Sequence, residues 1–165
     1  MNRSENELLD EYLGLPDRLE ALIAGLEEND LDLRLENDWS IREYICHLVE
    51  GELLWQINLR MIIGLNGEKF PFSWYPQHSQ MEWAQYWAYG SRSLSVLLDQ
   101  YRADTRFLVD TLKNLPDVWE HYGCITWPGY DEEFRYSVRD IVEMHINHLD
   151  EHARDIRAIR ANHGR

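Results

Sequence analysis

Three histidines lie close together near the C-terminus, in the run Met144-His145-Ile146-Asn147-His148-Leu149-Asp150-Glu151-His152. In an α-helix each residue advances by about 100°, so His148 and His152 project from one face a turn apart, with His145 about 60° from His148. Isoleucines recur on this face at three- and four-residue steps, which predicts that it packs into a helix-bundle core. Burying an unpaired polar group costs about 2–7 kcal/mol. Inward histidines therefore require hydrogen bonds or a metal ion.

Histidines four residues apart on one helix can bind the same divalent ion, and His145 with His148, three apart, could also do so. Because His145 and His152 are about 10 Å apart along the helix axis, all three cannot share one ion. Another ligand must come from elsewhere, and His47 is the natural candidate. It lies on the expected inward face of another helix, and Gly51, one turn further on, leaves space beside it. Three histidines leave a coordination position open for water or substrate, as in catalytic zinc sites.

The apolar pattern predicts four helices that position these residues. The first spans about 5–28 with a break near Pro16, and the second spans about 41–65, where Ser40 and Glu43 form a capping box. The third is expected over about 81–115, bent near Gly90, and the fourth over about 136–162. Long loops are expected over 66–79 and 117–133. The fold class is therefore all-α, a four-helix bundle with two long crossover loops, in a single domain of residues 1–165.

Composition narrows the classes of partner. The net charge of −14 argues against a nucleic-acid or membrane partner, because no positive field is present to attract phosphates. The two cysteines, Cys46 and Cys124, are too few for a disulfide framework and favour a reducing compartment. No apolar run approaches the roughly 20 residues that span a bilayer, and the N-terminus shows no signal-peptide pattern. A cytoplasmic location is expected.

Two motifs carry a resemblance to a known family. The segment Trp39-Ser40-Ile41-Arg42-Glu43-Tyr44-Ile45-Cys46-His47-Leu48-Val49-Glu50-Gly51-Glu52 resembles the W-S-x-x-E-x-x-x-H-L-x-x-x-E pattern of the DinB and YfiT-like superfamily. The later His148-x-x-x-His152 resembles the closing helix of that family. The resemblance extends over nearly the whole chain, because the order of the helices and the aromatic loops also fit.

The resemblance implies an up-down-down-up bundle, commonly a homodimer, with a divalent metal held by His47, His148 and His152. Zinc or nickel is the expected ion, and iron is possible because imidazole binds all three. Characterised members include transferases and isomerases that use a low-molecular-weight thiol such as bacillithiol or mycothiol, and many others are described only as metal-dependent hydrolases. No residue of this sequence singles out a thiol cofactor.

Several further residues are candidates for roles around the metal. Asp155 could accept an N–H from a histidine, serve as a general base, or simply be solvated. His145 could orient a ligand, donate to substrate, replace His152 in the site, or fill the core. His78 and His121 lie in the expected loops, where each is a surface residue, an acid–base group or a fourth ligand. The candidate substrate pocket consists of Gly51, Asn58, Trp74, Tyr75, Trp127 and Tyr130.

Two functions from different classes follow. The first is a metal-dependent hydrolase or thiol-dependent transferase that acts on a small molecule. The alternative is a non-catalytic, stress-related binding protein whose metal is structural, which a fourth protein ligand such as His78 or His121 would support. In a third reading the bundle holds no metal, and its histidines form hydrogen bonds in the core.

Overall fold

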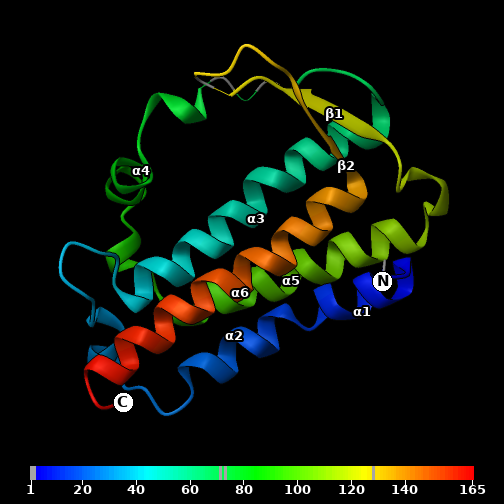
Figure 1. Cartoon of the computed structure of the whole chain (residues 1–165). Coiled ribbons are helices and arrows are strands. Elements are labelled where there is room, and N and C mark those ends of the chain that lie inside the picture. The colour runs from blue at the N-terminus through cyan, green and yellow to red at the C-terminus, as the bar shows by residue number, and fades with distance from the viewer. Residues whose placement is uncertain (1–2, 71, 73, 128) are drawn as a thin grey trace.

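The computed structural model describes residues 3–70, 72, 74–127 and 129–165. These form an up-down-down-up four-helix bundle, in which α1 and α2 together make the first helix, α3 the second, α5 the third and α6 the fourth (Figure 1). The α-helices and strands are α1 (Glu5–Leu13), α2 (Leu15–Ile23), α3 (Ile41–Gly64), α4 (Gln80–Tyr86), α5 (Leu94–Lys113), β1 (Tyr122–Ile125), β2 (Phe134–Ser137) and α6 (Val138–Asn162).

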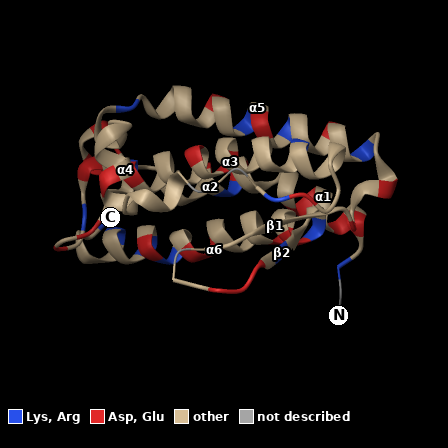
Figure 2. Cartoon of the chain, turned by 90° about the horizontal axis from the view of Figure 1, so that it is seen from above, with Lys and Arg blue, Asp and Glu red and all other residues tan. Residues whose placement is uncertain are grey.

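The two middle helices of the bundle, α3 and α5, run in the same direction, opposite to α1, α2 and α6 (Figure 1). The helix α3 packs against both α5 and α6, and the α1–α2 pair packs against the same two helices. Figure 2 shows α5 and α6 on opposite sides of the bundle, with both signs of charge along each. Because α3 and α6 are direct neighbours, residues on their facing sides can meet in the core.

Capping boxes set the starts of the helices that matter most for the site. At the start of α3 the Ser40 side chain accepts from Glu43 N, and the Glu43 side chain accepts from Ser40 N, as the sequence predicts. Ser137 and Asp140 form the same arrangement at the start of α6. The first bundle helix breaks at Gly14, two residues before Pro16, which is also as predicted, although α2 ends at Ile23 rather than near residue 28.

The single helix expected over 81–115, with a bend near Gly90, is wrong, because two separate helices occupy this range. The helix α4 ends at Tyr86, Ala88 takes a left-handed conformation (φ 53°), and α5 begins only at Leu94. The helix is interrupted because the aromatic residues of this segment pack on one another. Trp83 stacks on Tyr75 and on Trp87, outside the bundle core. Helical spacing of apolar residues predicts a helix but does not reveal which surface the helix covers.

The crossover expected as a loop over 117–133 instead contains part of a hairpin. Strands β1 and β2 pair antiparallel, with Cys124 opposite Arg135. The first crossover joins this hairpin, since Phe70 N donates to Cys124 O and Cys124 N donates to Glu68 O. A Cβ on Gly123 would collide with the Phe70 ring, so glycine is required at this close approach. Residues 71, 73 and 128 of the two connections lie outside the described residues.

The core consists mainly of aliphatic side chains from all four bundle helices. Polar residues are buried among them on α3 and α6, including His47, Glu52 and His145. In the part of the chain that the structure describes, no helix is long and apolar enough to cross a membrane.

Candidate metal centre

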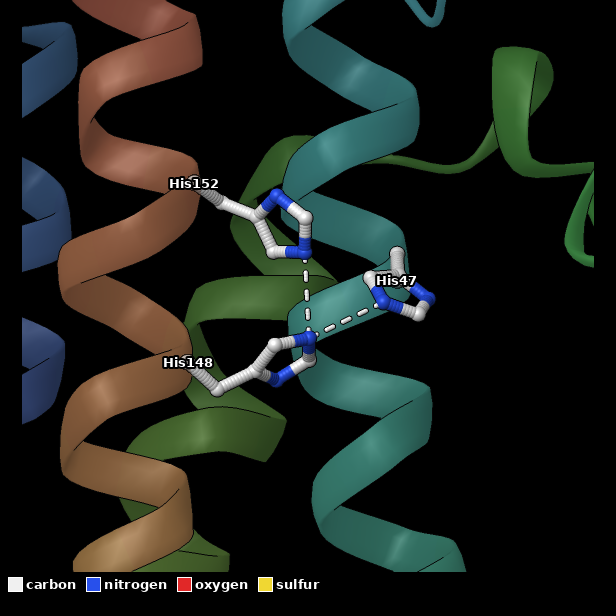
Figure 3. Close-up of side chains that lie close together, drawn as sticks. All are labelled: His47, His148 and His152. Atoms are coloured by element: carbon white, nitrogen blue, oxygen red, sulfur yellow. Dashed lines mark hydrogen bonds between the residues drawn. The ribbon is translucent and has the colours of Figure 1, made fainter.

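Two neighbouring helices bring three histidines together in the core. His47 lies in the second turn of α3, and His148 and His152 lie one turn apart on α6. Their imidazole rings point toward one another across the interface between the two helices (Figure 3). The sequence pattern predicted these three residues as ligands, and the structure places them in one cluster.

The side chains converge through the same atom of each ring. Nε2 of His148 lies 3.0 Å from Nε2 of His47 and 3.0 Å from Nε2 of His152. One ring nitrogen from each of the three histidines lies within 4.8 Å of the other two. With Zn–N distances of about 2.0–2.1 Å, two nitrogens of a tetrahedral site lie about 3.3 Å apart. The two separations that involve His148 are therefore close to the spacing that a divalent ion requires.

The donor set itself fits a cation. An imidazole Nε2 carries either one hydrogen or one lone pair, so Nε2 of His148 can make a good hydrogen bond to only one of its two nitrogen neighbours. A cation at the meeting point would accept all three lone pairs at once. Among the described residues the cluster contains no fourth histidine, cysteine or carboxylate. Such a set resembles catalytic zinc sites, which keep one position open, more than closed structural sites.

Burial keeps these imidazoles neutral. Desolvation, reinforced by neighbouring His152, lowers the pKa of His47 from 6.5 to about 3. Desolvation, reinforced by the other histidines around it, lowers the pKa of His148 to about 2. A neutral imidazole is the form that binds a metal ion. Both side chains are therefore ready to act as ligands at neutral pH.

Asp155 is placed behind the cluster rather than in it. Its Oδ2 lies 3.0 Å from Nδ1 of His152, on the opposite side of the ring from the meeting point. Accepting the Nδ1 hydrogen leaves the lone pair of His152 on Nε2, directed at the other two histidines. Metal-binding histidines commonly have such a carboxylate partner. Of the roles considered for Asp155, the geometry favours orientation of a ligand.

We expect Asp155→Asn to weaken zinc binding by about 10- to 100-fold, as loss of such partners commonly does. The dissociation constant is measured by competition with a chromogenic chelator. Asp150→Asn is the matched control, because Asp150 is an exposed acid on the same helix that pairs with Arg18 instead. Equal affinities of wild type and Asp155→Asn would contradict the orienting role.

His145 belongs to a different cluster. Its Nδ1 lies 3.0 Å from Oε2 of Glu52, whose side chain is completely buried on α3. Tyr12 donates its hydroxyl to Oε1 of the same carboxylate, and Gln56 Nε2 lies 3.4 Å from that oxygen. The possibility that His145 replaces His152 at the meeting point does not match this geometry. Sequence reasoning noted Glu52 only as part of a motif and missed its contact with His145.

A cavity of about 270 Å³ adjoins the histidines. Two of the metal-binding candidates, His47 and His148, contribute to its wall, and so does His145. A Cβ on Gly51 would lie 3.7 Å from Cε1 of His148, so glycine leaves free space next to this ring. The remaining described wall is mostly apolar and aromatic, formed by Leu54, Trp55, Phe72, Tyr75, Gln80, Trp127 and Met144.

The predicted pocket residues divide into two groups. Gly51, Tyr75 and Trp127 line the cavity. The other three are not among its described lining residues: Asn58 is buried and donates to Leu54 O, whereas Trp74 and Tyr130 are largely exposed. Trp55 and Phe72 were missed, although Trp55 lies one turn after Gly51 in the predicted second helix and Phe72 is an aromatic residue of a predicted loop.

The loop histidines and the cysteine beside His47 lie outside the cluster. His78 packs against Trp83 and Tyr86, and Nδ1 of His121 lies 3.3 Å from the backbone oxygen of Ile63. Neither is brought to the meeting point as a fourth ligand. Burial raises the pKa of the Cys46 thiol to about 12, which makes it a core residue rather than a nucleophile.

Comparisons with known proteins bear on the fold and the family of the chain. A search of the curated proteins found no match. A solved structure described as "YfiT from Bacillus subtilis is a probable metal-dependent hydrolase with an unusual four-helix bundle topology" superposes with a TM-score of 0.80. The match covers 99% of this chain and 91% of that chain at 14% sequence identity, so it shows a shared fold. The family model for the DinB superfamily matches residues 11–156, and the chain therefore belongs to the DinB superfamily.

Proposed function

We propose that this protein is a metal-dependent enzyme that acts on a small molecule, by hydrolysis or by transfer to a thiol. The observation that carries the proposal is the convergence of three Nε2 atoms beside a cavity with aromatic walls. The likeness to a structure described as "a probable metal-dependent hydrolase" supports the same proposal. His47, His148 and His152 would hold the ion, with zinc or nickel as the first candidates and iron as the third.

A divalent ion held by His47, His148 and His152 would supply Lewis-acid polarisation of a substrate oxygen, or would stabilise a thiolate. The protein supplies the rest of the chemistry. Asp155 orients His152, and burial keeps His47 and His148 neutral. The mostly apolar and aromatic wall offers few groups to solvate charge, which strengthens electrostatic interactions inside the cavity.

The cavity wall indicates the kind of substrate. Its volume of about 270 Å³ lies just below the usual range for ligand sites, which favours a compact molecule. Among the described lining residues none is a lysine or an arginine. The substrate that fits this cavity best is an uncharged apolar or aromatic molecule, with one polar group directed at the three histidines. A thiol that carries carboxylates would have to keep them outside.

Turnover by the metal-loaded protein tests the proposal. Zinc-loaded, nickel-loaded and chelator-treated samples are assayed with 4-nitrophenyl acetate, and with 1-chloro-2,4-dinitrobenzene in the presence of 2-mercaptoethanol. We expect at least one reaction to require the metal. It should be lost in Gly51→Leu, whose side chain would occupy the space beside His148, and retained in Gly51→Ala, whose Cβ makes an ordinary contact of 3.7 Å.

Two results would count against an enzyme. Rates that chelation and Gly51→Leu leave unchanged would place the reaction elsewhere on the protein. A bound ion that does not exchange, together with no turnover of either probe, would favour the alternative of a structural metal in a binding protein.

A further inference from the structure

A second cavity, of about 440 Å³, lies between α2 and the C-terminal end of α6. Its described wall consists of four arginines and three apolar residues, namely Arg18, Ala21 and Leu22 from α2, Arg157, Arg160 and Ala161 from α6, and Arg165. These are four of only sixteen basic residues in a chain whose net charge is −14. Among the described lining residues none is acidic. The charge of this cavity is therefore opposite in sign to that of the whole chain.

Two of the four guanidinium groups are paired with a carboxylate. Arg18 donates to Oδ1 of Asp150, which joins α2 to α6. A nitrogen of the Arg165 guanidinium lies 2.9 Å from Oδ1 of Asp30. Each aspartate offsets one positive charge. Four arginines against two aspartates leave the cavity with a surplus of two positive charges.

The other two arginines have different surroundings. Arg160 donates to the backbone oxygens of Leu22 and Ala24, at the C-terminal end of α2. Carbonyl groups at a helix end lack intrahelical partners, so Arg160 has a structural role in holding α6 against α2. Arg157 is exposed, and its guanidinium has no hydrogen-bond or ion-pair partner among the described residues. Its N–H donors are therefore available to a ligand.

This cavity is separate from the metal centre. Arg157 follows His148 by nine residues, which places it about 180° around α6 and about 13 Å further along the helix axis. The three histidines lie where α6 faces α3, whereas the arginines lie where α6 packs against α2 (Figure 1). The two cavities have no described lining residue in common. A molecule bound among the arginines would therefore not contact the three histidines through this wall.

The chemistry of the wall indicates the ligand. A planar guanidinium can donate two parallel hydrogen bonds to two oxygens of a phosphate group. A phosphate monoester carries about two negative charges at neutral pH, which matches the surplus of the cavity. A long polyanion such as a nucleic acid fits less well, because the net charge of −14 would repel its other phosphates.

We propose that this cavity binds the phosphate monoester group of a small molecule. Its volume lies within the usual range for ligand sites, and the apolar wall provides a surface for the body of that molecule. The site is additional to the proposed metal-dependent reaction and does not depend on it.

Calorimetric titration of the full chain with phenyl phosphate tests the proposal. We expect wild type to bind phenyl phosphate, and to bind phenyl sulfate, which has a similar shape but a single charge, more weakly. Arg157→Gln should weaken the binding of phenyl phosphate by about 10- to 100-fold, from the loss of charge-assisted hydrogen bonds. The matched control is Arg154→Gln, which removes the same charge from an exposed residue of α6 that is not among the described lining residues, and it should keep the wild-type affinity. Absence of binding by wild type, or equal losses in the two variants, would overturn the proposal.

Two further arms of the experiment locate the phosphate and its source. Chelator-treated wild type should bind phenyl phosphate as well as untreated protein does, whereas binding that requires the metal would place the phosphate at the histidines and contradict the site. Vesicles with equal amounts of phosphatidylcholine and phosphatidic acid present the same phosphate group on a membrane. Sedimentation of the protein with these vesicles, without binding of phenyl phosphate, would contradict a small-molecule ligand. Thermal unfolding is measured for each variant, and Arg18→Gln, which should also bind phenyl phosphate more weakly, supplies a second test if Arg157→Gln folds poorly.

Discussion

Replacing His148 by alanine is expected to lower the metal content of the purified protein from about one ion per chain to near zero. Nε2 of His148 is the atom that lies 3.0 Å from both of the others, so its loss leaves His47 and His152 without the ligand between them. Two imidazoles rarely suffice, since metal sites in proteins are commonly built from three or four protein ligands. Elemental analysis of protein purified without a histidine tag measures the change.

The matched control is His163→Ala. His163 is exposed at the end of α6, and among the described residues its ring is hydrogen-bonded only to the backbone oxygen of Arg34. It should keep its full metal content. The prediction of a metal centre would be contradicted if the wild-type protein contained no metal and could not be reconstituted with excess zinc, nickel or iron. The three histidines would then be explained only by hydrogen bonds in the core.

Acid is expected to destabilise the metal-free protein over an unusually high range of pH. The pKa values of His47 and His148 are lowered from 6.5 to about 3 and about 2 in the folded chain. As pH falls below about 6.5, the unfolded chain takes up protons at these residues and the folded chain does not. Stability is therefore complete above this pH and declines toward pH 3, by up to about 2.7 kcal/mol per pH unit for two such groups.

Urea unfolding of chelator-treated protein at a series of pH values between 8 and 4 measures this slope. The double variant His47→Gln/His148→Gln removes both groups and should show a flatter dependence, although it retains His145 and His152. Its stability relative to wild type should improve as the pH falls. Parallel profiles for the two proteins would mean that these imidazoles are not held neutral by burial.

Much of the candidate site could be predicted from the sequence, because helices convert sequence spacing into direction. The four-residue step between His148 and His152 places them on one face, and the capping box at Ser40 fixes where α3 begins and hence which face carries His47. The break at Gly14 and the positions of the four bundle helices follow from equally local signals.

What could not be predicted depends on contacts between distant segments. Glu52 and His145 are 93 positions apart, and nothing in either local pattern indicates that they meet. The short strands β1 and β2 and the interruption between α4 and α5 are set by which surface each segment covers. Trp83 stacks on Tyr75 and does not pack into the bundle core. Apolar periodicity alone does not distinguish these two kinds of packing.

The hydrogen bonds between the crossovers bear on how relatives of this protein could be recombined. Phe70 and Glu68 of the first crossover exchange backbone hydrogen bonds with Cys124 of the second, and the Phe70 ring occupies the place of a side chain at Gly123. A crossover grafted alone from another member would arrive without its complementary strand and would meet the wrong side chain at position 123. Chimeras that alter substrate preference should therefore exchange the two crossovers as a pair.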